Sequence, residues 1–587
     1  MKKIILCLCL MAMAGLFAAC DGGSAEPADT GNGQTEQTQQ ESANAEVGSE
    51  QATPRGEQTV SAGPDDINWD EHITFTWLMT GTPPNDYYTS YSDNPVVNYL
   101  EHRFNVTFDI QQAPVGTEAD ALALMMGSGR FTDVMDLGAF TGSIPQLYYD
   151  DIIIDISRWL DYMPNLRNLL DTDPELVRAA YDDDGRILML PIVQDESGYS
   201  FTGLLYRHDI LETMTSGNVQ FPSGYDAPTT LADWEYMLPL MLEYFESAGF
   251  ADFAPLIIPP QGVIHFGALM NTFGAFHQFY SRNGVVYAGI MEPEFYDFVI
   301  TMRDWFEFGW IHQDFASRTG DMFFMPNPPL VFGGAAGVFH GMIMHMGDRM
   351  SMPELDMNFD VRPMSSPRAP GIAHQDMIRN PGGRFGMALS SAVYAGNHDI
   401  GRFLSIIDLL YSEYGGKLRA VGLTAEQIPP GHTIMDRMGM SEGAYWFDES
   451  GNVVFHPNIT LVGGHIGIDA VNAIRLPGLY AESILNAVRD DETVRAQSLW
   501  GIQDNITEVH PLPNQLSPTV EESAILSTND ARINDHRDQM LTMFIMGTAP
   551  LTEATWEEFT NQLIAFGIEE NREIWQAAYN RYLVRGR

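Results

Sequence analysis

The alternation of strand-like and helix-like segments early in the chain most constrains what it can fold into. Residues 73–79 (ITFTWLM) have the length and apolar content of a buried strand. Asn94-Pro95 has the form of a helix N-cap followed by proline at the first helical position. The patterns that follow are a strand at 106–110, a helix at 118–126 and a strand at 133–137. This order predicts a mostly parallel sheet covered by helices, which is the α/β class.

The length of the chain requires more than one hydrophobic core. The chain has 587 residues, and its globular part is expected to begin near Ile67, so it is long enough for two lobes. A formal net charge of −47 would repel nucleic-acid phosphates, which excludes a nucleic-acid partner.

The first twenty residues have the pattern of a secretory signal. A pair of lysines precedes an apolar run at 4–17, and small residues lead to Cys20. The end of this segment resembles a bacterial lipobox, with Phe17 where leucine is more usual, and it implies that Cys20 is lipidated after cleavage. The other two cysteines lie in the removed segment, so the mature chain has no disulfide within it. The alternative is simple secretion with Cys20 free.

Residues 21–66 differ sharply in composition from the rest of the chain. They are rich in Gly, Ser, Thr, Glu, Gln and Ala and have almost no large apolar side chains. Such a segment cannot bury enough surface to offset its chain entropy, so it is expected to be a disordered tether.

The segment 184–211 contains two short apolar runs separated by a polar span. The first run, 187–193, contains Pro191, which favours an edge or connecting strand, and the second run, 201–206, meets Arg207-His208-Asp209. The motifs DGRILMLP and LLYRHDIL resemble the crossover between lobes in extracellular solute-binding proteins of carbohydrate-type ABC importers (family 1 extracellular solute-binding proteins).

Four further stretches resemble this family. They are MMGSGRFTDVMDL (125–137), with Thr132 where proline is typical, PTTLADW (228–234), FGGAAGVFHGMIMHM (332–346), and GRFGMALS (383–390), which would be a second crossover strand. The resemblance spans about residues 70–585.

Other patterns predict individual elements in the second half of the chain. Apolar spacing over 400–411 predicts a helix that Gly415-Gly416 would end, and 444–455 predicts a hairpin. Two amphipathic helices are expected around Trp556 and Trp575.

The resemblance implies a type II periplasmic-binding-protein-like fold with two α/β lobes, each a mostly parallel sheet flanked by helices, joined by crossover strands. The expected divisions are a signal peptide (1–20), the tether (21–66), the first part of lobe 1 (67–190), lobe 2 (191–385), and a return to lobe 1 at 386–587 with C-terminal helices near the hinge. Ligand-induced closure would bend the chain at 188–194 and 386–390.

The ligand site is expected between the lobes, and its residues are assigned from their positions in the inferred strand order. His340 falls where the family places a ligand-facing residue. The full set of candidate ligand-binding residues is Asp86, Tyr87, Asp136, Phe140, Tyr206 and His340.

The function that the resemblance implies is capture of a sugar or oligosaccharide for an ABC transporter permease. The protein would be a monomer, anchored to the cell membrane by lipid on Cys20, and would face the extracellular or periplasmic side. No catalytic residue, cofactor or metal is expected. A surface glycan-processing enzyme and a sensory or scaffold lipoprotein share the same signal and tether, so both remain alternatives.

Three sequence features resemble catalytic or metal-binding motifs but lack the context that such motifs require. Residues 439–443 (GMSEG) fit the G-x-S-x-G nucleophile motif around Ser441, but a hairpin pattern follows instead of a helix. His340 and His345 lack a third partner in the sequence and are interpreted as structural rather than metal-binding. Many relatives have a calcium loop after the helix that begins near Trp234, whereas residues 246–253 (ESAGFADF) have too few oxygen ligands.

Overall fold

The larger of two parallel-rich sheets forms the first lobe. The computed structural model describes residues 67–586 except for 81–86, 115–116, 141, 195–201, 259–268, 271, 318–326, 349, 352–357, 372–384, 396–398, 461–465, 488–490, 501–508 and 514. Within these residues the first sheet has the strand order β16-β4-β11-β3-β1-β2. Its strands are β1 (Ile73–Thr80), β2 (Val106–Ala113), β3 (Val134–Asp136), β4 (Leu190–Gln194), β11 (Phe385–Leu389) and β16 (Gly478–Tyr480).

The two predicted crossover strands, β4 and β11, are neighbours in this sheet. They pair antiparallel, with Phe385 opposite Pro191 and Met387 opposite Leu190. β11 also runs antiparallel to β3, whereas β1, β2 and β3 pair in parallel, as do β4 and β16. β11 is therefore the reversed strand of an otherwise parallel sheet.

The second lobe is built on a sheet with the order β10-β5-β9-β6. Its strands are β5 (Thr202–Arg207), β6 (Ala254–Leu256), β9 (Ala336–Met342) and β10 (Val361–Met364). β6 and β9 are parallel, and β5 runs antiparallel to both of its neighbours. The first strand after the crossover is thus reversed in this sheet, as the second crossover strand is in the other.

Smaller strands accompany the two main sheets. β7 (Phe279–Arg282), β8 (Val285–Ala288) and β17 (Val509–Pro511) form one sheet. β12 (Tyr445–Phe447) and β13 (Val453–Phe455) form the predicted hairpin, and β14 (Ile459–Thr460) pairs with β15 (Ile466–Gly467).

Each lobe has its own hydrophobic core, in which side chains from its helices pack against its sheet. Lobe 1 contains α2 (Pro95–Phe104), α3 (Glu118–Ser128), α4 (Ile144–Tyr149), α5 (Pro164–Thr172), α6 (Pro174–Ala180), α13 (Ala392–Ala395), α14 (Ile400–Leu409), α15 (Glu413–Val421) and α16 (Thr433–Arg437). Lobe 2 contains α7 (His208–Met214), α8 (Leu231–Ala248), α11 (Pro293–Glu307), α12 (Pro328–Phe332), α17 (Asp491–Trp500), α18 (Val520–Ile545), α19 (Glu553–Ala565) and α20 (Ile568–Tyr582).

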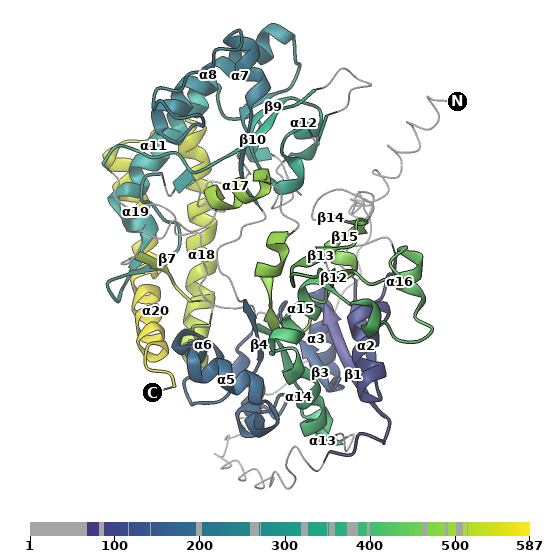
Figure 1. Ribbon diagram of the computed structural model, residues 1–587. Helices are drawn as coiled ribbons and strands as arrows, with labels where there is room; N and C mark the ends of the chain where they lie inside the picture. The colour runs from purple at the N-terminus through teal and green to yellow at the C-terminus, as the bar shows by residue number, and fades with distance from the viewer. Residues whose placement is uncertain are drawn as a thin grey trace, which may run out of the picture. The chain divides into compact units, whose positions relative to one another are not determined.

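The predicted return of residues 386–587 to lobe 1 is wrong for its second half. The chain stays in lobe 1 as far as β16 and then crosses between the lobes a third time, entering lobe 2 again, because α17 packs against β5 and β10. α18 contacts α11, and Phe544 and Phe559 lie in the same core as Trp234. Figure 1 shows α18 and α19 beside α11, and α20 lies lower in the view, against α18. The apolar face of α18 is the physical reason, since its buried side chains complete the core of lobe 2.

The position of Gly415 and Gly416 corrects another prediction. Ser412 accepts a hydrogen bond from the Gly415 backbone N–H and begins α15, so both glycines lie inside a helix instead of ending one. A Cβ at Gly415 would lie 2.1 Å from the carbonyl oxygen of Leu409. Glycine is therefore required here for the close approach of α15 to the end of α14.

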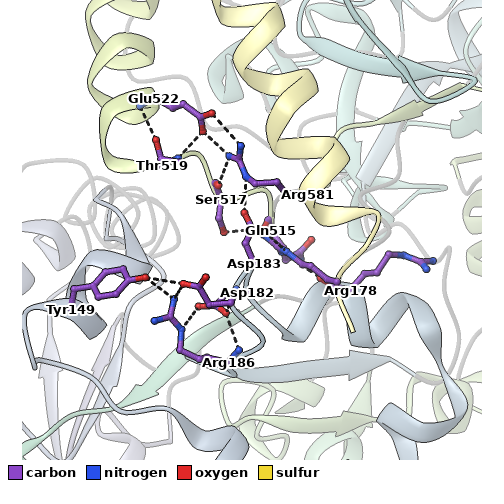
Figure 2. Close-up of polar contacts among 12 residues, drawn as sticks. Tyr149, Arg178, Asp182, Asp183, Arg186, Gln515, Ser517, Thr519, Glu522 and Arg581 are labelled. Carbon is purple, nitrogen blue, oxygen red and sulfur yellow. Dashed lines mark hydrogen bonds and ion pairs between the residues drawn. The ribbon is translucent and has the colours of Figure 1, made fainter. Parts of the chain in front are cut away.

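The last helix is also tied to lobe 1 by ion pairs. The Nε of Arg581 lies 2.8 Å from Asp183 Oδ2, and its Nη2 lies 2.6 Å from Glu522 Oε2. Arg585 Nε lies 2.7 Å from the other oxygen of Asp183. Figure 2 shows Arg581 between Asp183, in the turn that precedes β4, and Glu522 in the first turn of α18. This turn next to the first crossover is thus held by the C-terminal helix.

Candidate functional site

The carboxyl ends of the parallel strands in lobe 1 meet at one edge of the sheet. In open α/β sheets, ligands bind outside this edge. The second crossover strand, β11, begins at the same edge because it is antiparallel to β3 and β4. The parallel strands end there at Thr80, Ala113, Asp136, Gln194 and Tyr480.

Two buried aspartates, Asp133 just before β3 and Asp136 at its end, hold β3 against β1. Asp133 Oδ2 accepts hydrogen bonds from the backbone N–H and the hydroxyl of Thr76, each 2.8 Å long. Asp136 Oδ2 accepts from the backbone N–H of Thr80 at 3.3 Å and from its hydroxyl, and Asp136 Oδ1 accepts from the Gly138 N–H at 2.9 Å. The repeated threonine–aspartate pairing fixes β1 against β3 up to their last residues.

The corresponding edge of lobe 2 is connected directly to that of lobe 1. β9 ends at Met342, which pairs with Thr202, the first residue of β5. Gln194 ends β4 at the edge of lobe 1, and eight residues later Thr202 begins β5 at the edge of lobe 2. An extended chain of that length reaches at most about 28 Å, so the two edges lie within that distance of one another.

The segment after β1 is anchored by Tyr88. Its hydroxyl donates to the carbonyl of Ala470 at 3.1 Å and accepts from the side-chain amide of Asn94 at 2.9 Å. The same amide donates to the carbonyl of Asn472 at 2.8 Å. Asn94 also caps α2 as predicted, accepting from the N–H groups of the first turn. This network fixes the position of Tyr87, the preceding candidate residue, whose own side chain is half-buried.

The predicted site residues of lobe 1 differ in how accessible they are to a ligand. Asp86 lies outside the described residues. Tyr87 and Phe140 are half-buried; Phe140 lies four residues after the end of β3, and Tyr87 follows β1 by seven residues. Asp136 is buried at the edge, and both of its oxygens already bind within the sheet. Direct contact of these residues with a ligand stays a prediction.

The two predicted residues of lobe 2 lie inside the sheet. His340 opposes Leu204, and Tyr206 opposes Val338, so all four share one face of the β5–β9 pair. Tyr206 has 0% of its surface exposed and packs in the core with Phe221. Its expected position on a ligand-facing surface is therefore corrected: Tyr206 lies four residues inside β5, where its side chain points into the core.

The predicted hinges overlap two strands of the lobe 1 sheet. Residues 190–194 and 385–389 are β4 and β11, which pair with each other and with β16 and β3. Bending at these residues would have to move the paired strands together, and the hinge positions stay a prediction.

His345 has the structural role that the sequence analysis assigned to it. It is buried, and its Nδ1 accepts a hydrogen bond from the Met342 backbone N–H at 2.9 Å, just where β9 ends. Burial lowers the pKa of His345 from 6.5 to about 4. The neutral ring is therefore the form present in the folded protein at neutral pH.

We expect His345 to make the protein less stable in mild acid. Because its pKa is lower in the folded state, the unfolded state binds the proton more readily, and stability is lost as the pH falls from about 6.5 to about 4. The full loss is about 3 kcal/mol. Denaturant unfolding of the wild type and of His345→Gln at pH 7 and pH 4.5 measures this, since glutamine can accept the same hydrogen bond without titrating. An equal loss of stability in both proteins would contradict it.

The motif around Ser441 lacks the surroundings of a nucleophile. Helix α16 precedes it and strand β12 follows it, which is the reverse of the strand–turn–helix order that the motif requires. The loop after α8 is equally unlike a calcium loop. Phe250 and Phe253 pack on Phe245, and the carboxylate of Asp252 lies 3.0 Å from His312 Nε2.

The fold is similar to that of solved transporter binding proteins. No family model and no curated protein matches the sequence. An "HMO binding ABC-transporter associated Solute Binding Protein" from Bifidobacterium longum infantis is 19% identical, with a TM-score of 0.61, and the match covers 87% of this chain and 99% of that one. The S. pneumoniae substrate binding protein FusA, solved with kestose, is 17% identical, with a TM-score of 0.64 and the same coverage. The alginate-binding protein AlgQ2, solved without calcium ion, is 18% identical, with a TM-score of 0.60 and coverage of 86% and 98%. The predicted two-lobed α/β fold is confirmed by these similarities.

Proposed function

We propose that this protein is the substrate-binding component of an ABC importer, and that it captures an oligosaccharide between its lobes and delivers it to the permease subunits. The observation that carries the proposal is the fold match over nearly the whole length of proteins named for this role. The connected carboxyl edges of the two sheets supply a place for the ligand, since this is where open α/β sheets bind small molecules.

The ligand is expected to contact aromatic rings and hydrogen-bonding groups at these edges. Sugar rings present an apolar face and a rim of hydroxyls, so half-buried aromatic residues next to buried polar groups suit them. Tyr87 and Phe140 offer the rings, and Asp136 ends β3 four residues before Phe140. His340 remains a candidate on the side of lobe 2. No catalytic group is part of the proposal.

Ligand binding should be detectable as thermal stabilisation. A ligand present at a hundred times its dissociation constant stabilises the folded state by about 2.7 kcal/mol. We expect at least one oligosaccharide in a panel of neutral and uronate sugars to raise the melting temperature of the mature protein. Calorimetry would then compare the wild type with Phe140→Ala and with Tyr225→Ala, an exposed aromatic residue in lobe 2 that serves as a control. We expect weaker binding only for Phe140→Ala.

Two outcomes would contradict the proposal. If no sugar in a broad panel raises the melting temperature of the protein, the proposed oligosaccharide binding is contradicted. Hydrolysis or transfer of a bound glycan by purified protein would favour the glycan-processing enzyme instead. Solution scattering adds an independent readout, because closure of the lobes should lower the radius of gyration when the ligand is added.

Membrane attachment is expected to depend on Cys20. Among the described residues, no helix is both long enough and apolar enough to cross a membrane. The lipobox-like sequence before Cys20 provides the anchor in this proposal. The variant Cys20→Ser should therefore move from the membrane fraction to the soluble fraction, as measured by fractionation and immunoblotting. If the variant stays with washed membranes, another anchor must exist.

A further inference from the structure

A cluster of three potential metal ligands lies in lobe 2, apart from the edge proposed for sugar binding. His208 and Glu212 are one helical turn apart on α7, and Asp360 immediately precedes β10. We propose that His208, Glu212 and Asp360 form a binding site for a divalent transition-metal ion, with Zn²⁺ as the reference cation. The proposal does not depend on the sugar-binding function.

The geometry of the cluster suits a single ion. His208 Nε2 and Glu212 Oε1 are 3.6 Å apart, and ligand atoms of all three residues lie within 4.8 Å of one another. Ligands of a tetrahedral zinc ion, at about 2.0–2.2 Å from the metal, lie roughly 3.4 Å from each other. Small rotamer changes of Glu212 and Asp360 would therefore complete the arrangement.

The protein backbone and a neighbouring tyrosine position the imidazole. The backbone N–H of His208 donates to the carbonyl of Asp360 at 2.8 Å, which fixes the start of α7 against the strand that carries Asp360. The Nδ1 of His208 lies 3.4 Å from the hydroxyl of Tyr206, and Nε2 lies 3.6 Å from Glu212 Oε1. Metal-binding histidines are typically oriented in this way through their second nitrogen.

The two carboxylates leave the site open to an ion from solution. The side chain of Glu212 is 52% exposed, and that of Asp360 is 36% exposed. Arg362 pairs with Asp360, but its shortest bond, 2.6 Å, is to Oδ2, and its bond to Oδ1 is longer, at 3.2 Å. Asp360 thus retains acceptor capacity, while Arg362 holds the carboxylate in place. Three protein ligands leave a fourth position for water.

The chemistry of the ligands selects the class of ion. An imidazole nitrogen suits zinc, copper and nickel, whereas calcium and magnesium prefer sites made only of oxygen atoms. The cluster is also separate in sequence from residues 246–253, at the end of α8 and just after it, which resemble no calcium loop.

The test is a Zn²⁺ titration of the metal-free mature protein by calorimetry, in excess Mg²⁺ to suppress weak binding to the acidic surface. We expect one site in the wild type and in Glu243→Gln, a control on the exposed face of α8. Glu212→Gln should weaken zinc binding by about 100-fold, because it removes one of three ligands. Glu212 is exposed, so this variant is expected to fold normally, which circular dichroism would verify.

A spectroscopic readout identifies the ligand atoms. Co²⁺ bound in place of Zn²⁺ should give visible absorption bands in the wild type that weaken in Glu212→Gln and in His208→Gln. Equal zinc affinity in the wild type and Glu212→Gln, or Co²⁺ spectra that the two substitutions leave unchanged, would overturn the proposal. Neither measurement involves sugar, so failure here is distinguishable from failure of the proposed function.

Discussion

Replacing Arg402 with alanine should lower the free energy of unfolding by about 3 kcal/mol or more, because it removes four hydrogen bonds from a charged donor, each of which contributes about 1.5–3 kcal/mol. The side chain of Arg402 is 0% exposed and lies in α14. Its Nη1 donates to the carbonyls of Asn68 and Glu71, at 2.8 and 2.6 Å, and its Nη2 donates to those of Phe104 and Asn105, at 2.7 and 3.1 Å.

The position of these carbonyls explains why the loss should be large. Asn68 and Glu71 lead into β1, and Phe104 and Asn105 connect α2 to β2, so one guanidinium holds the starts of two adjacent strands. The central carbon of the Arg402 guanidinium also lies 5.3 Å from the centre of the Trp69 ring. Without Arg402, these four carbonyls lose its guanidinium donors, and the Trp69 ring loses a cation on its face.

Two further variants separate this network from the loss of charge alone. Arg402→Lys keeps the charge but lacks the planar fork of donors, so we expect it to recover only a small part of the stability. Arg167→Ala, at an exposed arginine paired with Asp161, should change stability by less than about 1 kcal/mol. Denaturant unfolding measures all three. A loss for Arg402→Ala no larger than that for Arg167→Ala would contradict the prediction.

Local sequence signals were sufficient to predict many individual elements. Asn94-Pro95 begins a helix because the asparagine oxygen accepts from the N–H groups of the first turn. Thr230 and Asp233 form a reciprocal capping box at the start of α8. The hairpin at 445–455 turns where Asp448 and Gly451 indicate. In each case the determining contacts lie within a few residues of one another, which is why the sequence reveals them.

Contacts between distant segments could not be predicted in the same way. The third passage between lobes depends on the packing of α17 against β5 and β10. The carbonyls that surround Arg402 come from residues about 300 positions earlier. His208 and Glu212 have the spacing of a helical metal pair, which the sequence does contain, but Asp360 joins them only through the pairing of β10 with β5.

The burial of Tyr206 shows why its position along a strand could not be predicted from the sequence. The sequence placed this residue after the crossover, near a ligand. The register instead places Thr202, the first residue of β5, at the carboxyl edge of lobe 2 and Tyr206 near the other end of the strand. Alternation along a strand predicts which residues share a face, but it does not say how far the strand extends before it reaches the edge.

Tyr206→Ala is therefore expected to act on stability rather than directly on sugar binding. Removing a fully buried aromatic side chain costs about 3–5 kcal/mol, because a cavity remains in the core. The ring packs 6.3 Å from that of Phe221 and 5.8 Å from that of His208, so the cavity would also loosen the start of α7.

Tyr206→Phe supplies the matched control. It keeps the ring and removes only the hydroxyl that faces His208, so its loss of stability should be about 1 kcal/mol. Denaturant unfolding measures the stability of both variants, and calorimetry measures sugar affinity at a temperature where both are folded. If Tyr206→Ala keeps wild-type stability but loses sugar affinity, the ring contacts the ligand. The ring would then take a different position in the ligand-bound protein from its buried position here. If Tyr206→Ala loses stability but keeps wild-type sugar affinity, Tyr206 serves the hydrophobic core of lobe 2. The ligand then contacts other residues, at the carboxyl edges of the two sheets.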